Sequence, residues 1–549
     1  MTELSTPDAI HEPTTGVAKD AFDRLTFLGW SGGLAAIVAG LAMSFFLFGY
    51  ALIYWRNADM DFMVIYNALV LNDGKPQLFF DHTAYITILA VEFWYRLLHT
   101  LGLLQAWSLS SIPAASDASA FDAAMTQAVR AGRLLAFLIA IGCVLIFAGL
   151  SRRIVRGWRV ALLATLAFAL SGGIAVHSRI LRSELVAACP VLFALMILII
   201  IGRRGNIARP LWMAAASALC VLGLENKVQA ILLIAALPLL IVPFGSADSA
   251  SAAFWRTRPA SWLTAGLAAV AAVAATGLAW PLLVTGFDRA LLDIAQFHPL
   301  LLGRFGVYQT VLAILIGVCM IFYARIWRVS AAETLASMFA VIAGAMVALL
   351  ALDLQYNASN VIAVFNPLEK MLSFADATTA DAANGANLAG ILWLLFDGLT
   401  SVFARYSFFL HSSPRPTVFL TWLIIPGLVY AWRSGEKLAA IQALVLLLAA
   451  IGIDTLGVRR GLKSEYFIFT DPLIVLSGAI LLDTFSDLRF HRWTYPVAMV
   501  LFGLHIVVGQ AEPVKYAFMR RGPESICEWR GHYMPLMALP WCSSAPSRS

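Results

Sequence analysis

The feature that most constrains this chain is a series of at least ten stretches, each of roughly 16 residues or more, that contain no Asp, Glu, Lys or Arg. A helix of about 20 residues crosses the roughly 30 Å hydrocarbon core of a bilayer, so each stretch is about long enough to span it. A helix also pairs its own backbone amides, each of which costs several kcal/mol if left unpaired in lipid. We therefore expect an all-α polytopic membrane protein, and residues 28–55 are its clearest span.

The amino-acid composition is also typical of a protein that is surrounded mainly by lipid and not by water. Hydrophobic residues make up 60% and charged residues 13% of the 549 residues, whereas soluble domains carry roughly 25% charged residues. The formal net charge is +6, but the basic residues are spread over many loops instead of forming one patch, which argues against nucleic-acid binding. The first 27 residues are polar, so we expect 28–55 to be retained as a signal anchor.

The basic residues predict the orientation of the helices. Connections at 152–159 and 203–209 are rich in Arg, and short Lys/Arg-rich loops are typical of the cytoplasmic side. If successive spans cross the membrane in alternating directions from these cytoplasmic loops, the N-terminus is also cytoplasmic. The segments outside are then 56–133, 286–305, 353–416 and 511–549. The predicted spans number about thirteen and cover residues 28–55, 134–151, 160–177, 185–202, 210–224, 228–244, 261–285, 306–324, 333–352, 417–432, 438–453, 470–484 and 494–510.

The sequence also predicts an irregular segment, an interfacial helix and a candidate disulfide in the segments expected to be outside. Residues 386–410 are apolar enough for a fourteenth span, but Asp397 and Arg405 inside them favour an interfacial or re-entrant element. Residues 84–107 predict a helix lying in the interface, on which Glu92 is spaced to pair with Arg96. Cys527 and Cys542 lie in the polar tail, where a disulfide forms only if the tail faces an oxidising compartment.

Two carboxylates stand at the outer end of the first span, in the sequence ADMDFMVI at 58–65. At a spacing of two, Asp59 and Asp61 point to different sides of a helix and to one side of an extended segment. The structural alternative is that Asp59 caps a helix and Asp61 is a first-turn acid favoured by the helix dipole. The functional alternative is a pair of carboxylates that act on a substrate at the membrane surface.

This arrangement resembles the GT-C superfamily of membrane glycosyltransferases, in which a first helix ends outside in an acidic motif within a long loop of interfacial helices. The amino-acid sequence at 58–65 is similar to the acidic motif of the GPI mannosyltransferases and of bacterial polyprenol-phosphate-dependent relatives. The resemblance implies that Asp59 or Asp61 is the catalytic base or binds a metal and acceptor, without separating the two. The chain lacks the Asp-Glu pair of the aminoarabinose and protein mannosyltransferase branches, so their substrates are not carried over.

Other segments fit the same resemblance. The turn at 74–85 implies an acceptor cleft with Asp81, His82 and Tyr85, although Asp81 is equally suited to cap the next helix. The turn at 177–184 resembles the arginine-and-glutamate turn before helix 4 of the superfamily, and it adds His177 and Glu184 to the cleft. The candidate phosphate-binding cations are Arg182, Lys227, Arg460 and Lys463, and Tyr466 completes the candidate cleft.

Lys227 follows an apolar run, where a buried lysine costs a few kcal/mol without a partner, and the nearby Glu225 is a candidate partner. The resemblance implies that such a lysine binds the donor phosphate. Arg460 and Lys463 belong to a group of cations on the face expected to be outside. Such a group either binds phosphate or indicates that the predicted topology is shifted there.

The resulting hypothesis is an inverting glycosyltransferase that moves a sugar from a polyprenyl-phosphate donor to a glycolipid, polysaccharide or protein on the outer face of a bacterial inner membrane. Some members use a divalent metal such as Mg²⁺ or Mn²⁺, but one Asp-x-Asp supplies too few ligands to establish it. The alternatives are a lipid or small-molecule transporter and a non-catalytic subunit of a membrane complex. The predicted division is a cytoplasmic segment 1–27, a catalytic module 28–245, a variable module 246–510 and an outer tail 511–549.

Overall fold

The computed structural model describes residues 15–57, 61–75, 84–203, 206–245, 251–284, 306–359, 388–406, 415–457, 465–485, 491–518, 523–528 and 530–542. Within these ranges all regular structure is helical and no strand occurs. The main helices are α1 Thr15–Phe45, α2 Met63–Asn72, α3 Tyr85–Thr100, α4 Ala118–Ile154, α5 Trp158–Ala169, α6 Gly172–His177, α7 Glu184–Arg203, α8 Arg209–Asn226, α9 Ala230–Ile241, α10 Ala253–Arg256, α11 Arg258–Val284, α13 Gly306–Ile326, α14 Ala331–Ser359, α16 Leu388–Arg405, α17 Val418–Arg433, α18 Lys437–Gly457, α19 Asp471–Phe485, α20 His491–Phe518 and α21 Arg530–Tyr533. Short π or 3-10 turns include η1 Phe46–Tyr50, η2 Tyr54–Asn57, η4 Leu109–Ser111, η5 Val242–Phe244, η10 Tyr466–Phe469 and η11 Pro523–Ile526.

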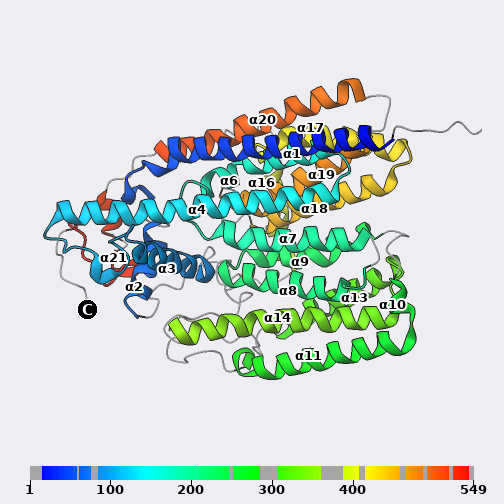
Figure 1. Cartoon of the computed structure of the whole chain (residues 1–549), viewed down its shortest axis with the longest axis horizontal. Coiled ribbons are helices and arrows are strands. Elements are labelled where there is room, and N and C mark those ends of the chain that lie inside the picture. The colour runs from blue at the N-terminus through cyan, green and yellow to red at the C-terminus, as the bar shows by residue number, and fades with distance from the viewer. Residues whose placement is uncertain are drawn as a thin grey trace, which may run out of the picture.

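The thirteen predicted spans all overlap helices, but only seven helices in the described part of the chain are long and apolar enough to cross a membrane. These seven are Leu28–Tyr50, Ala118–Ile154, Glu184–Arg203, Pro259–Leu283, Ala331–Leu352, Lys437–Gly457 and Pro496–Lys515. The long helices of the bundle lie roughly alongside one another, with α1 and α20 at one edge and α11 and α14 at the other (Figure 1).

The outer surface of the bundle is apolar. On α11, for example, Leu267, Val270 and Leu278 are 62%, 66% and 70% exposed. Soluble monomers rarely present such extended apolar surfaces to water, because the hydrophobic effect favours covering them. A lipid environment removes that penalty, so these exposed faces and the long apolar helices together show a helical membrane protein.

Two predicted boundaries were wrong. Helix α4 begins at Ala118, not at residue 134, because Asp117 caps its first turn by accepting a hydrogen bond from the amide of Ala120. The predicted span 160–177 is broken into α5 and α6 at Leu170–Ser171, where the Ser171 hydroxyl accepts from the amide of Ile174. A serine side chain competes for backbone groups in this way and therefore starts a new helix.

A second hydrophobic core lies at one end of the bundle, separate from the main core between the long helices. It joins α2, α3, the first turns of α4 and the tail, which gather at the left of Figure 1. The tail is fastened there by a hydrogen bond from the amide of Leu536 to the Tyr66 hydroxyl at 3.0 Å and by a disulfide between Cys527 and Cys542. We call this assembly the loop-and-tail cap.

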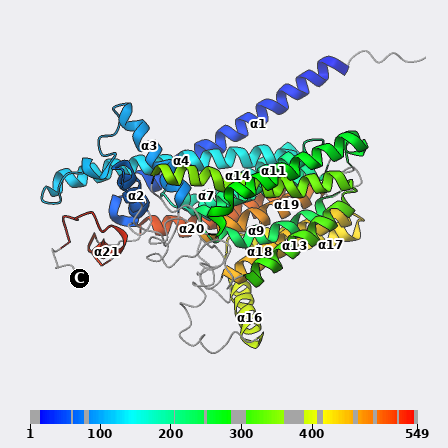
Figure 2. The same cartoon turned by 90° about the horizontal axis from the view of Figure 1, so that it is seen from below.

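Helix α3 of the cap confirms the predicted ion pair, since Arg96 Nη2 lies 2.5 Å from Glu92 Oε1. The ambiguous segment 386–410 contains α16, which contacts α18 and projects from the bundle at a steep angle (Figure 2). This direction differs from that of the long helices, and the interfacial or re-entrant interpretation of the segment stays a prediction.

Gly49, in η1, allows the end of the first span to approach the turn before α7. A Cβ atom added at Gly49 would lie 2.9 Å from the Cα and Cβ atoms of Arg179. We expect Gly49→Ala to lower the stability of the folded protein by about 1–3 kcal/mol through overpacking, measured as a lower thermal unfolding midpoint in detergent. Gly40→Ala in α1 is the matched control, because its added Cβ would meet nothing within 4 Å. An unchanged midpoint for Gly49→Ala would contradict the close approach.

Candidate functional site

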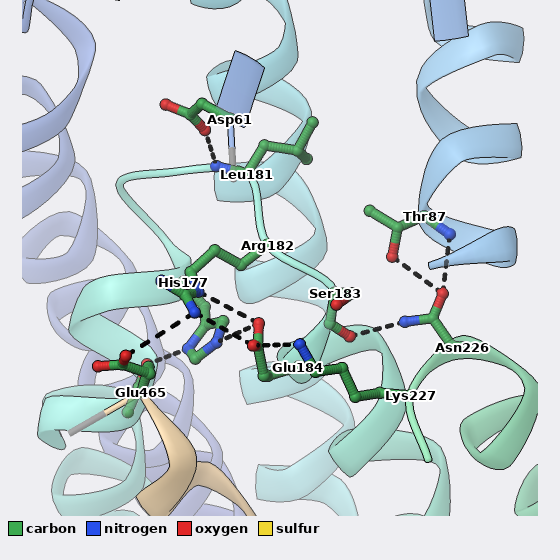
Figure 3. Close-up of polar contacts among 11 residues, drawn as sticks. Asp61, Thr87, His177, Leu181, Arg182, Ser183, Glu184, Asn226, Lys227 and Glu465 are labelled. Atoms are coloured by element: carbon green, nitrogen blue, oxygen red, sulfur yellow. Dashed lines mark hydrogen bonds and ion pairs between the residues drawn. The ribbon is translucent and has the colours of Figure 1, made fainter. Parts of the chain in front are cut away.

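The candidate site is built around the turn at 178–183, which connects α6 to α7 and is buried along its whole length. The turn is fastened on three sides. The amide of Leu181 donates to Asp61, the carbonyl of Ser183 accepts from the side chain of Asn226, and the side chain of Arg182 bonds to Glu184 (Figure 3). It therefore links the acidic motif to the residues at the start of α7 and the end of α8.

Glu184 is the centre of a buried charged cluster. Lys227 Nζ lies 2.7 Å from Glu184 Oε1, and Arg182 Nη2 lies 3.2 Å from the same oxygen. His177 Nε2 lies 3.4 Å from Glu184 Oε2, and the ring is oriented by its Nδ1, which lies 2.6 Å from the carbonyl of Gly173. The structure thus brings together four of the predicted site residues, which come from α6, the following turn, the start of α7 and the residue after α8.

One more carboxylate approaches this cluster from a distant part of the chain. Glu465, which directly precedes η10, has its Oε1 atom 3.8 Å from Arg182 Nη2 (Figure 3). Its side chain is 12% exposed, whereas that of Glu184 is fully buried. We define the Glu184 cluster as His177, Arg182, Glu184, Lys227 and Glu465. Besides His177, the cluster contains two cations and two carboxylates.

Asn226 fixes the position of Lys227 relative to the cap. Its Oδ1 accepts from the amide and hydroxyl of Thr87 at 3.0 and 3.1 Å, while its Nδ2 donates to the Ser183 carbonyl at 2.6 Å. The amide of Ala84 donates to the Asn226 carbonyl at 3.0 Å. One asparagine therefore joins the start of α3, the turn before α7 and the end of α8.

Lys227 itself has a different partner from the one its sequence neighbourhood indicated. The prediction that Glu225 pairs with Lys227 is not what the structure shows, because the carboxylate beside Lys227 is Glu184 of α7. Lys227 is the extended residue after α8, and its backbone leaves the helix at that point. Glu225 is buried, and its Oε2 has no hydrogen-bond partner among the described residues.

Asp61 is completely buried, and both of its oxygens are engaged. Oδ2 accepts from Arg133 Nε at 2.7 Å, and Oδ1 accepts from the Leu181 amide. Arg133 is also fully buried and donates through Nη1 to the carbonyls of Leu52 and Gly49 at 2.6 and 3.3 Å. This pair fastens the end of the first span, the start of α2, α4 and the turn before α7 to one another.

The remaining predicted residues have separate positions. Tyr85 begins α3 and donates its hydroxyl to the carbonyl of Leu352 in α14 at 3.2 Å, so it joins the cap to the bundle. Tyr466 begins η10, next to Glu465. The other predicted site residues lie outside the described residues and are Asp59, Asp81, His82, Arg460 and Lys463.

Sequence reasoning did not identify Arg133, Asn226 or Glu465 as parts of the site. Arg133 has a recognisable signal, because it directly precedes an uncharged run of α4 and lies within the long helix. Asn226 and Glu465 lie inside motifs that were noticed, but their partners are far away in the sequence. In the described part of the chain, no three His, Cys, Asp or Glu side chains lie close enough to hold a metal ion.

Compared with protein families, curated proteins and solved structures, the chain has no match in any of the three.

Proposed function

We propose that this chain is an inverting glycosyltransferase that takes a sugar from a polyprenyl-phosphate donor. The observation that supports it is the turn at 178–183, which connects the acidic motif through Leu181 to buried cations through Arg182. A carboxylate base that removes a proton and cations that stabilise a leaving phosphate are the two groups that such a transfer needs. Buried charges beside apolar helices also suit a substrate that reaches the site from the membrane.

In this mechanism Asp59 is the base. It removes the proton of the acceptor hydroxyl while that oxygen attacks the anomeric carbon, and the bond from that carbon to the phosphate oxygen breaks with its electron pair leaving on the lipid phosphate. Asp61 is less suited to the role of base, because Arg133 and Leu181 occupy its two oxygens. We assign Asp61 a positioning role in the acidic motif. A single displacement inverts the configuration at the sugar carbon.

The leaving phosphate requires positive charge beyond what the Glu184 cluster supplies. Arg182 and Lys227 share Glu184, and Glu465 lies near Arg182, so two carboxylates offset the charges of these two cations. Arg460 and Lys463 precede Glu465 in the sequence and are the cations that we propose to supply the excess. Electrostatic stabilisation of this kind is strongest in a site that excludes water. The proposed location is a bacterial inner membrane, with the site on the outer face.

The test is to incubate the purified full chain with a panel of radiolabelled polyprenyl-phosphate sugars and to measure loss of label from the lipid. We expect one donor to be consumed, and the sugar to appear on an acceptor or in water with inverted configuration. Nucleotide sugars, as soluble control donors, are expected to remain intact. If no polyprenyl-phosphate sugar in the panel lost its label, the proposed function would be contradicted.

A second function is favoured by one observation, a buried charged network among the later helices. Arg415 Nη2 lies 2.7 Å from Asp471 Oδ1, and Arg415 also pairs with Asp454, which is near the end of α18. Thr470 accepts from Arg415 and donates to Asp454, each at a distance below 3.0 Å. Ionisable groups within membrane helices are typical of transport pathways. Vesicles containing the chain that translocate labelled lipid without releasing sugar would favour a transporter.

A further inference from the structure

The C-terminal tail is a part of the loop-and-tail cap that the proposed mechanism does not use. Helix α21 lies next to α2 in the fold, although the two contacting residues Tyr66 and Leu536 are 470 residues apart in the sequence (Figure 1). The apolar side chains that the tail buries in the core of the cap are Ile526, Met534, Met537 and Leu539, each at most 4% exposed. The hydrophobic effect therefore holds the tail against the cap.

The tail contacts the chain shortly before the two carboxylates of the acidic motif. Trp541 packs against Tyr54 of η2, with 5.8 Å between the ring centroids, and edge-on against Phe121 of α4 at 6.2 Å. Tyr54 is 3% exposed, and its hydroxyl donates to Asp122 Oδ1 at 2.5 Å. Aromatic pairs of this kind fix a geometry in addition to burying apolar area. Tyr54 is therefore held between α4 and the tail.

The tail also contacts the chain shortly after the carboxylates. The amide of Leu536 donates to the hydroxyl of Tyr66, which is fully buried in α2. Phe62 directly follows Asp61, is fully buried, and stacks on Tyr54 with 5.8 Å between the ring centroids. This ring pair connects the two sides of the acidic motif, and Trp541 of the tail packs against one of its rings.

The disulfide between Cys527 and Cys542 keeps Trp541 on this surface. It joins cysteines that are 15 residues apart, and Cys542 is the residue directly after Trp541. Closing a loop in this way restricts the conformations that the loop adopts when it leaves its packing surface. At the other end of the loop, η11 directly precedes Cys527 and contacts η2. Both ends of the loop therefore lie against the segment that precedes the carboxylates.

We propose that the tail positions the acidic motif, with Trp541 and the neighbouring disulfide as the positioning groups. Asp59 lies five residues after Tyr54 and three before Phe62 in the sequence, so a shift of this ring pair is passed along the chain to the proposed base. A displacement of about 1 Å is enough to lower a catalytic rate about 10²-fold. The role of Asp59 rests on the proposed function, whereas the placement of the segment by the tail is measured without a substrate.

Hydrogen exchange of the purified full chain, followed by mass spectrometry, tests the placement. For Trp541→Ala we expect the amides of residues 54–66 to exchange about 10-fold faster than in the parent protein, because two aromatic contacts are lost. Amides of α7 and α8 in the bundle should keep their parent rates. Trp541→Phe retains a ring between Tyr54 and Phe121 and should restore most of the protection.

Reduction of the disulfide tests the same placement without a substitution. Dithiothreitol converts the bond between Cys527 and Cys542 to two thiols and is itself oxidised to a cyclic disulfide, while the other four cysteines are already free. We expect faster exchange at 54–66 in the reduced parent protein. In Cys527→Ser/Cys542→Ser, exchange should already be fast and the reductant should add nothing. The proposal is overturned if neither Trp541→Ala nor the reductant changes exchange at 54–66.

Activity distinguishes a positioning role from a merely structural one. With the donor that the panel identifies, Trp541→Ala should lower kcat by about 10- to 100-fold and leave KM for the donor close to the parent value, because the base is displaced and the phosphate-binding cations are not. Equal loss of kcat in Trp541→Ala and Trp541→Phe would contradict the positioning role. Faster exchange in Trp541→Ala, together with a parent protein that consumes no donor, would support the placement and contradict the proposed function.

Discussion

Replacing Asp59 with Asn is expected to lower the rate of sugar release from the lipid donor by about 10²–10⁴-fold, the range typical of losing a general base. The amide is nearly the same size as the carboxylate but does not accept the proton of the attacking hydroxyl. The thermal unfolding midpoint should stay close to that of the parent protein. Both quantities are measured on the same purified sample, with the donor identified by the panel.

The variant Asp61→Asn distinguishes the roles of the two carboxylates, Asp59 and Asp61. It removes the charge that Arg133 meets in a fully buried pair, and breaking such a pair by changing one partner costs about 3–5 kcal/mol. We therefore expect a large loss of folded protein, in contrast to Asp59→Asn. Our assignment of base and positioning residue would be reversed if Asp59→Asn transferred sugar at the parent rate and folded Asp61→Asn did not.

Replacing Glu184 with Ala is expected to cause the largest loss of stability among the cluster residues, about 3–5 kcal/mol. The substitution removes the carboxylate that Lys227 and Arg182 share at 2.7 and 3.2 Å, and it leaves two buried like charges near each other. We expect a strongly reduced yield of monodisperse protein and a lower unfolding midpoint.

Two controls make this expectation specific. Glu92→Ala removes a carboxylate that is 10% exposed from an i,i+4 helix pair whose arginine is 56% exposed, and such helix pairs contribute only about 0.3–0.5 kcal/mol. The double variant Glu184→Gln with Lys227→Met removes one buried charge of each sign and should recover part of the lost stability. If Glu184→Ala and Glu92→Ala shifted the midpoint equally, the Glu184 cluster would not be the anchor that its geometry indicates.

Some contacts in this protein follow from local spacing. Glu92 and Arg96 are four residues apart on one helix, so forming α3 is enough to bring them together. The partner of Lys227 does not follow in this way. Proximity in sequence pointed to Glu225, but the packing of α7 against α8 brings Glu184 to it from 43 residues away. The same holds for Asp61 with Arg133, which are 72 residues apart.

The sequence by itself determined that the chain is helical and where its apolar helices lie, because a bilayer imposes its conditions on each segment separately: about 20 apolar residues and an internally paired backbone. The tertiary structure alone decided which carboxylate meets which cation, as for Lys227 with Glu184 and Asp61 with Arg133. Those outcomes depend on residues from distant segments that must share one desolvated space, where a charge is stable only beside its partner. No pattern within a single segment contains that information.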